Sequence, residues 1–128
     1  MTKPAKLVLI CDLTGAALDW AVARCEGAHP QISYPDKRLF GAIGDTFDYS
    51  TDWAQGGPII EREGISTRLN HKQAQLWEAY IWLPMQHDQS EADSNSYTAF
   101  GMTPLIAAMR CYVASKLGNE VDVPEELI

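Results

Sequence analysis

The residues best suited to chemistry form one short run, Asp52-Trp53-Ala54-Gln55-Gly56-Gly57-Pro58. Two glycines directly before a helix leave several backbone N–H groups pointing at one spot, and the positive end of a helix dipole favours an anion there. Asp52 and Gln55 add orienting hydrogen bonds, and Trp53 adds a stacking surface. The run therefore predicts a site for an anion or a nucleotide-like ligand, made by Asp52, Trp53, Gln55, Gly56 and Gly57.

Ordinary structural roles account for the same residues, and this alternative stays open. Residues 50–52 are Ser-Thr-Asp, which cap helices, while the glycines suit a turn and Trp53 suits a core anchor. The run is not a phosphate loop, because it lacks the spacing and the Lys-Ser/Thr pair of that motif. A second pair, Asp19-Trp20, either lines a groove with Asp52-Trp53 or stabilises the first turn of a helix and packs at the edge of the core.

No other group of residues predicts catalysis or metal binding. No spacing between the three histidines matches a zinc motif; they are His29, His71 and His87. A Gly-x-Ser-x-Gly turn is absent from the sequence. Carboxylates are so frequent, at 17 residues, that choosing two of them for acid–base work would be arbitrary. We therefore predict no catalytic residue, no metal site and no cofactor, which argues against an enzyme.

The three cysteines, Cys11, Cys25 and Cys111, lie in apolar segments. An odd number at unpatterned spacing is poor material for a disulfide framework. A thiol in apolar surroundings keeps a high pKa and stays inert. We expect three reduced, buried and unreactive thiols in a cytosolic protein.

Length and composition predict one domain over residues 1–128, because 46% hydrophobic residues suffice to build a core at this length. The net charge of −7 argues against nucleic acid as a partner, since affinity for phosphates comes mainly from lysine and arginine. The apolar run 7–10 is too short for a signal segment or a membrane span, so no membrane partner is expected.

The first half of the chain alternates between strand and helix patterns. Residues 7–11 form a continuous apolar run that predicts a strand buried on both faces. A helix follows, with Thr14 as its cap and Gly27 past its end. Runs 31–34 and 38–43 flank a turn and predict a hairpin.

The middle of the chain predicts a helical turn over residues 52–55, an interruption at the glycines, and a short helix over 58–63 that ends at Gly64. Residues 65–69 alternate as a strand does. Residues 76–83 fit a helix or a strand, and their aromatic and β-branched content favours a strand. A polar loop over 85–96 and a short strand over 97–100 follow.

Residues 104–117 give the clearest helix pattern, with Thr103 as cap, proline first and Gly118 as stop. Its apolar stripe comprises Leu105, Ile106, Met109, Tyr112, Val113 and Leu117. Alanines elsewhere on it keep its surface thin enough for close approach to a sheet. The elements together predict an α+β fold, with an antiparallel-dominated sheet of about five or six strands covered by two main helices.

Three segments together carry a resemblance to a family. They are residues 13–23, which begin Leu-Thr-Gly-Ala-Ala-Leu-Asp-Trp, residues 49–60, which include Ser-Thr-Asp-Trp-Ala-Gln-Gly-Gly-Pro, and the helix with the tail after it, residues 100–127. They resemble the NinX-like proteins of phages and prophages, a family of unknown function. Residues 30–46 and 85–96 depart from the family pattern. The resemblance implies a phage accessory protein acting in the host cytoplasm, and it admits an α-β-α sandwich.

Two classes of function follow. The first is a non-enzymatic interaction module that binds an unknown host or phage protein, alone or as a homodimer. The alternative is a small-ligand binding protein that uses the glycine-rich loop before Pro58 to hold an anion or a nucleotide-like molecule.

Overall fold

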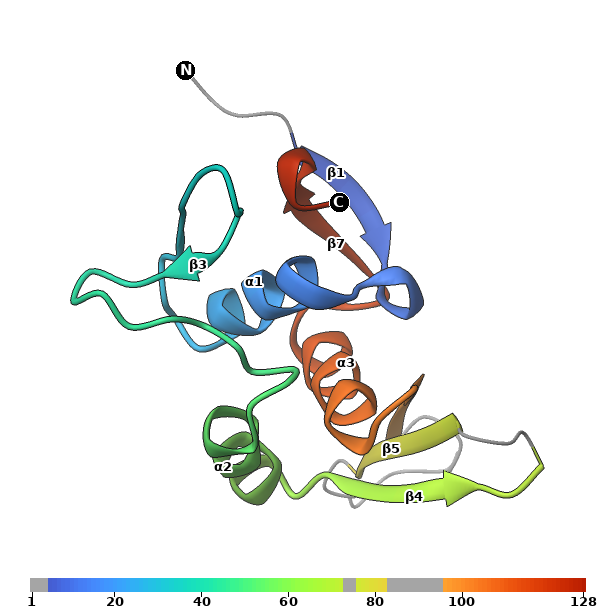
Figure 1. Ribbon diagram of the computed structural model, residues 1–128. Coiled ribbons are helices and arrows are strands. Elements are labelled where there is room, and N and C mark those ends of the chain that lie inside the picture. The colour runs from blue at the N-terminus through green and yellow to red at the C-terminus, as the bar shows by residue number, and fades with distance from the viewer. Residues whose placement is uncertain (1–4, 73–75, 83–95) are drawn as a thin grey trace, which may run out of the picture.

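The computed structural model describes residues 5–72, 76–82 and 96–128 (Figure 1). In chain order the elements are β1 (Ala5–Leu9), the 3₁₀ turn η1 (Ile10–Asp12), α1 (Gly15–Cys25), β2 (Gln31–Ile32), β3 (Leu39–Phe40), α2 (Trp53–Glu63), β4 (Ser66–Asn70), β5 (Leu76–Trp82), β6 (Ser96–Gly101), α3 (Pro104–Leu117), β7 (Glu120–Pro124) and the 3₁₀ turn η2 (Glu125–Leu127). The α+β class predicted from the sequence is confirmed.

The described strands form three small antiparallel sheets instead of one sheet of five or six strands. Their orders are β1-β7, β2-β3 and β4-β5-β6. The predicted size was wrong because β1 pairs with β7, a strand in the C-terminal tail for which no strand was expected. Helix α3 lies between this pair and the three-stranded sheet, so the described strands do not make one central layer (Figure 1).

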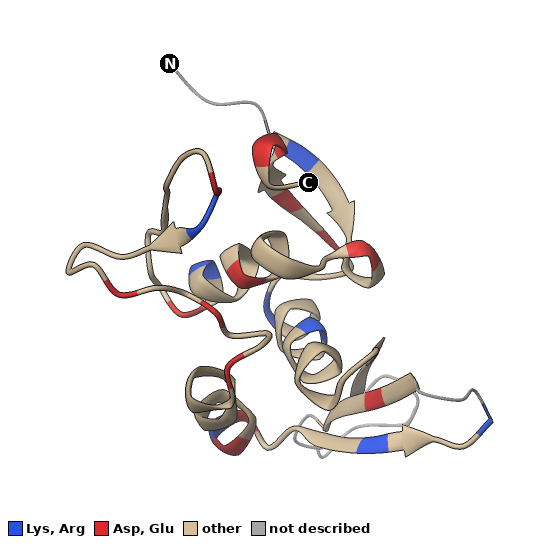
Figure 2. Ribbon diagram, viewed as in Figure 1, with Lys and Arg blue, Asp and Glu red and all other residues tan. Residues whose placement is uncertain are grey.

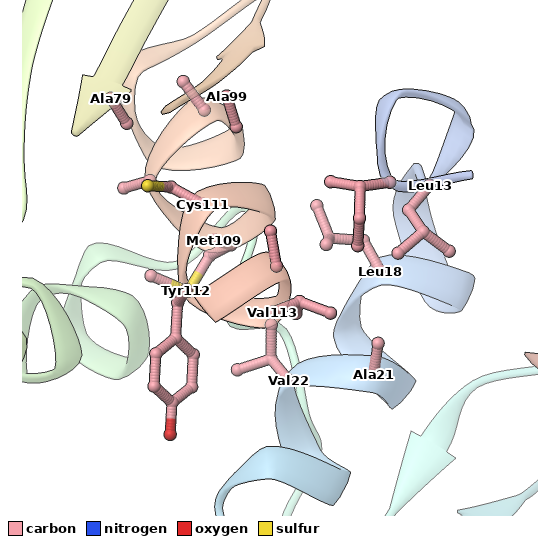
Figure 3. Packing of buried hydrophobic residues seen from close by; sticks show 14 of the residues in the cluster. Leu13, Leu18, Ala21, Val22, Ala79, Ala99, Met109, Cys111, Tyr112 and Val113 are labelled. Carbon is pink, nitrogen blue, oxygen red and sulfur yellow. The ribbon is translucent and has the colours of Figure 1, made fainter. Parts of the chain in front are cut away.

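Helix α3 is the centre of the core. Its predicted bounds are confirmed, and the hydroxyl of Thr103 caps it by accepting a hydrogen bond from the N–H of Ile106 at 3.0 Å. Figure 3 shows Leu18 and Val22 of α1 on one side of the helix, and two sheet alanines beside Cys111 on another. Most of the predicted apolar stripe is buried, although Leu117 at the helix end is exposed.

The contact between α3 and the sheet is unusually close at Gly101. A Cβ atom there would lie 2.7 Å from the backbone nitrogen of Ala107 and 2.8 Å from Cγ2 of Ile106. Ala107 and Ala108 are fully buried, as are Ala79 and, nearly so, Ala99 on the facing strands. The expectation that small residues let this helix approach a sheet is therefore met, because small side chains stand on both sides of the contact.

Strand β1 is less buried than its apolar sequence suggested. Leu7 and Leu9 are exposed, while Val8 packs against the core with Val121 and Val123 of β7. The expectation of a strand covered on both faces was wrong because β1 belongs to a two-stranded sheet of which α1 covers one face. The alternation of a strand then sends every second side chain to solvent.

Helix α2 is continuous, where the sequence predicted a break at the glycines. Gly56, Gly57 and Pro58 all lie inside it, and Gly64 ends it in the left-handed conformation, with φ 66°. Gly56 is buried beside Leu105 of α3 and the carbonyl of Tyr49. Tertiary packing of this kind stabilises a helix more than intrinsic propensity does, so it overrides the unfavourable Gly-Gly-Pro run.

The other predicted elements are largely confirmed. Helix α1 begins after Thr14, although the Thr14 side chain makes no capping hydrogen bond. The hairpin over 31–43 is present in the shorter form of β2 and β3, and the strands over 65–69, 76–83 and 97–100 correspond to β4, β5 and β6. The predicted polar loop over 85–96 lies outside the described residues except at Ser96, where β6 begins. Among the described helices, none is long and apolar enough to cross a membrane.

We expect Met109→Ala to lower the free energy of unfolding by about 2–5 kcal/mol, the usual loss for a large buried side chain. Met109 is fully buried in the described structure. Leu117→Ala is the matched control in the same helix, and it should cost far less because Leu117 is 46% exposed. Chemical denaturation measures both, and similar losses would contradict the packing of α3.

Candidate functional site

Two of the residues predicted to bind a ligand, Asp52 and Gln55, hold the start of α2 in place. The carboxylate of Asp52 accepts a hydrogen bond from the N–H of Ala54 at 2.9 Å. The side chain of Gln55 accepts from the N–H of Asp48 at 2.9 Å and donates to the carbonyl of Thr46 at 3.2 Å. Asp52 and Gln55 therefore fasten the segment before α2 to the helix.

The backbone arrangement expected for an anion site is not the one found. The N–H groups of Gln55 and Gly56 donate to the carbonyl of Asp52, at 3.0 and 2.9 Å, as helix bonds. Gly57 directly follows Gly56 inside the helix. Trp53 is 53% exposed, so it is not a core anchor either. Ligand binding by these five residues stays a prediction, but the converging N–H groups on which it was based are used in helix hydrogen bonds.

Asp19 has a structural partner of its own. It is buried on α1, not in the first turn as predicted, and its carboxylate accepts a hydrogen bond from the N–H of Ser50 at 2.7 Å. Burial raises its pKa to about 6. Trp20 is half-buried beneath the Arg24 guanidinium, which lies 5.6 Å from the ring centroid. Both Asp-Trp pairs thus use their carboxylates to bind backbone N–H groups near residues 50–54.

A polar cluster that the sequence did not predict joins the three helices. The Arg62 guanidinium contacts both carboxylate oxygens of Glu26, at 3.1 and 2.6 Å. The hydroxyl of Tyr112 donates to the same carboxylate. Hydrogen bonds from Arg62 lower the pKa of Glu26, and burial raises the pKa of Tyr112. The cluster pairs its charges internally, which suits a clamp between α1, α2 and α3 better than a reactive site.

A groove opens between β1 with η1 on one side and β6 on the other, with α3 as its floor. Its volume is about 290 Å³. It is lined by Leu9, Ile10, Cys11, Thr98, Ala99, Phe100, Arg110, Ala114 and Asn119. Leu9 and Phe100, one on each wall, are 46% and 43% exposed. We call this feature the β1–β6 groove.

Arg110 holds the two walls of the β1–β6 groove together. Its Nε donates to the carbonyl of Leu13 at 2.9 Å, and one terminal nitrogen donates to the carbonyl of Phe100 at 2.7 Å. Its partial burial lowers its pKa.

Among the described helices, α3 alone carries basic residues and no acidic ones, as Figure 2 shows.

The cysteines do not behave as one buried set. Cys11 is exposed at the rim of the β1–β6 groove, which corrects the prediction of three buried thiols, because the chain turns outward at η1. Cys25 is half-buried and Cys111 is buried, and burial raises their pKa values to about 11 and about 12. The three thiols are free.

The size and lining of the β1–β6 groove indicate what it can accept. Small-molecule sites usually span about 300–1,000 Å³, so a hollow just below that range suits one or two side chains of a larger partner. Its walls are mainly apolar, and its polar groups come from Arg110, Thr98 and Asn119. The sequence could not reveal it, because one wall exists only through the pairing of β1 with β7.

A second hollow, of about 440 Å³, lies along β4 and β5 and has a more polar lining. At its centre, Glu78 accepts hydrogen bonds from Arg68 at 2.8 Å, from Asn70 at 2.9 Å and from the Tyr80 hydroxyl. The bonds from Arg68 and Asn70 join β4 to β5, and Arg68 lies directly opposite Glu78, whereas Tyr80 is on the same strand as Glu78. The charged pair in this hollow therefore stabilises the hairpin.

Comparison with protein families matches residues 10–116 to the family described as Bacteriophage P22, NinX. The chain belongs to the phage P22 NinX family. The match includes the groove residues from Ile10 to Ala114 but not Leu9 or the tail after residue 116. No curated protein matches the chain. Membership of the NinX family makes this a phage accessory protein.

We expect the two neighbouring glycines of α2 to respond in opposite directions to alanine. Gly56→Ala should lower the free energy of unfolding by about 1–3 kcal/mol, the usual cost of overpacking, because its Cβ would lie 2.5 Å from the Tyr49 carbonyl oxygen. Gly57→Ala should raise it by about 0.5–1 kcal/mol through lower chain entropy, since its nearest neighbour, in Trp53, is 4.0 Å away. Equal effects in urea denaturation would contradict a continuous α2.

The raised pKa of Asp19 predicts a pH-dependent contribution to stability. Asp19 ionises near 3.8 in the unfolded chain and at about 6 in the folded protein, so folding retains its proton between these values. The stability that Asp19 contributes to the fold is therefore complete below the pKa of the unfolded chain and is lost as pH rises through the pKa of the folded protein. Relative to the parent, Asp19→Asn should gain up to about 3 kcal/mol between pH 4 and pH 7. A constant difference in denaturation at the two pH values would contradict this.

Proposed function

We propose that this phage accessory protein is a non-enzymatic interaction module of the host cytoplasm, which binds a host or phage protein through the β1–β6 groove. The observation that carries the proposal is the pair of exposed apolar side chains, Leu9 and Phe100, on facing walls of one hollow. Adjacent exposed apolar groups of this kind mark interaction surfaces more often than scattered single ones do.

The apolar surface continues beyond the groove. Leu7, two residues before Leu9 and on the same face of β1, is exposed. Met102, directly after β6, is exposed as well. Interfaces bury such side chains at their centre and keep polar groups at the rim. Glu120 and Asp122, the strand partners of Leu9 and Leu7, supply a polar border on the β7 side.

The cytoplasmic setting is supported by the cysteines. Cys11, Cys25 and Cys111 are free thiols, and Cys11 is exposed to solvent. Free thiols persist in reducing compartments, whereas secreted proteins tend to oxidise them. A phage accessory protein that acts on the host meets such a compartment in the cytoplasm.

The proposal is tested by selection from a displayed library of segments from host and phage proteins, with the full chain as bait. Selected segments should bind the parent, and Leu9→Asp or Phe100→Asp should weaken binding by about 30-fold, as hot-spot changes of about 2 kcal/mol do. Ile43→Asp is the matched control, because Ile43 is 90% exposed and lies in the turn after β3, away from the groove.

Each variant is first checked for an unchanged thermal transition, since all three positions are exposed. Failure to select any segment would count against the proposal, as would segments that bind Phe100→Asp as tightly as the parent. A dimer seen by ultracentrifugation, and dissociated by Phe100→Asp but not by Ile43→Asp, would support it with a second copy as the partner.

A further inference from the structure

In the described part of the chain, one edge of β6 has no strand paired with it and borders the β1–β6 groove. Within the described residues, β6 pairs with β5 and with no other strand. Thr98, Ala99 and Phe100 form the β6 wall of the groove, opposite Leu9. A strand edge presents N–H and C=O groups that can pair with a strand from another chain.

The backbone groups that face the groove follow from the bond to Arg110. Because the Phe100 carbonyl accepts from this side chain at 2.7 Å, it turns away from β5. In an antiparallel ladder, residues two apart turn their N–H and C=O groups to the same side. Thr98 therefore directs its N–H and C=O into the groove, beside the apolar side chains.

Arg110 differs from three exposed cations of the structure in its burial and in its partners. Arg62, Arg68 and Lys116 each form an ion pair with a glutamate. Arg110 is half-buried, donates to two neutral carbonyls, and forms no ion pair with any carboxylate that the structure describes. A guanidinium has five N–H donors, so three remain.

A partly desolvated cation of this kind binds an incoming anion strongly, because charge-assisted hydrogen bonds gain strength away from water. The apolar walls made by Leu9, Ala99 and Phe100 select a ligand that is apolar next to its charge. The net charge of −7 repels a polyanion such as nucleic acid. A carboxylate in an apolar polypeptide segment meets both conditions.

We infer that the partner segment is an extended strand that pairs with the open edge of β6 and places a carboxylate on Arg110. This inference rests on the proposed function of the β1–β6 groove and names the chemistry of its partner. Main-chain pairing would supply affinity, and alternate side chains would enter the groove and supply specificity.

The test uses synthetic eight-residue peptides of alternating valine and threonine that carry one glutamate, scanned along the sequence, with fluorescence anisotropy as the readout. The best glutamate peptide should bind at least about tenfold more tightly than its glutamine counterpart. Methylating backbone nitrogens one at a time should abolish binding at every second position only, because alternate N–H groups face β6.

On the protein side, Arg110→Gln should remove the preference for glutamate over glutamine. Arg24→Gln is the matched control, since Arg24 is exposed and stacks on Trp20. Arg110 also ties Leu13 to β6, so its variant is checked by thermal unfolding. If the Arg110→Gln variant does not fold, the inference is tested with the parent protein alone, by the glutamate-to-glutamine exchange and the methylation scan.

The outcomes separate this inference from the function on which it rests. Equal binding of glutamate and glutamine peptides, or a methylation scan without alternation, would overturn the inference. If Phe100→Asp still abolished the binding of these peptides, the proposed function of the groove would remain supported. Absence of peptide binding, or binding unaffected by Phe100→Asp, would overturn both. Tighter binding of an eight-residue thymidine oligonucleotide than of any glutamate peptide would overturn the assignment of a carboxylate.

Discussion

The close contact between α3 and β6 constrains the rest of the structure. At Gly101 the strand and the helix approach as near as a missing side chain allows, with a Cβ position 2.7 Å from the nitrogen of Ala107. Because α3 sits this deep on the three-stranded sheet, its remaining sides are available to α1, α2 and β7. The core is therefore built around one helix that touches elements from both halves of the chain, and it depends on small residues as much as on large ones.

Polar side chains fix how the elements join around this helix. The bidentate contact of Arg62 with Glu26 ties α2 to the end of α1, and Tyr112 brings α3 into the same cluster. Gln55 fastens the segment before α2 through two backbone groups. Exposed ion pairs contribute little on their own, so the value of these contacts lies in the orientation they impose. Arg110 has the same tying role, yet its bonds end on carbonyls, and it forms no ion pair with a carboxylate of the described residues.

Much of the fold could be predicted where the signal is local. Thr103, Pro104 and Gly118 mark both ends of α3. The alternation of apolar and polar residues predicts β4. The predictions that were wrong concern elements stabilised by residues distant in the sequence. Strand β7 forms by pairing with β1, and α2 continues through the Gly-Gly-Pro run because Gly56 is packed against other parts of the chain. The candidate site shares this limit. The polar groups of Gln55 and Asp52 predict a ligand site, yet in the fold they bond to the backbone. Leu9 and Phe100, far apart in the sequence, line the same groove only after folding.

The pairing of β1 with β7 affects the order in which the parts of the fold form. Ala5 faces Pro124 and Leu9 faces Glu120, so the first described strand finds its partner near the C-terminal end of the chain. Closing so long a stretch of chain carries an entropic cost that the earlier contacts must first reduce. A nascent chain on the ribosome would thus hold α1, α2 and the three-stranded sheet before its first strand docks. The groove wall bearing Leu9 would therefore form last, after the wall that bears Phe100.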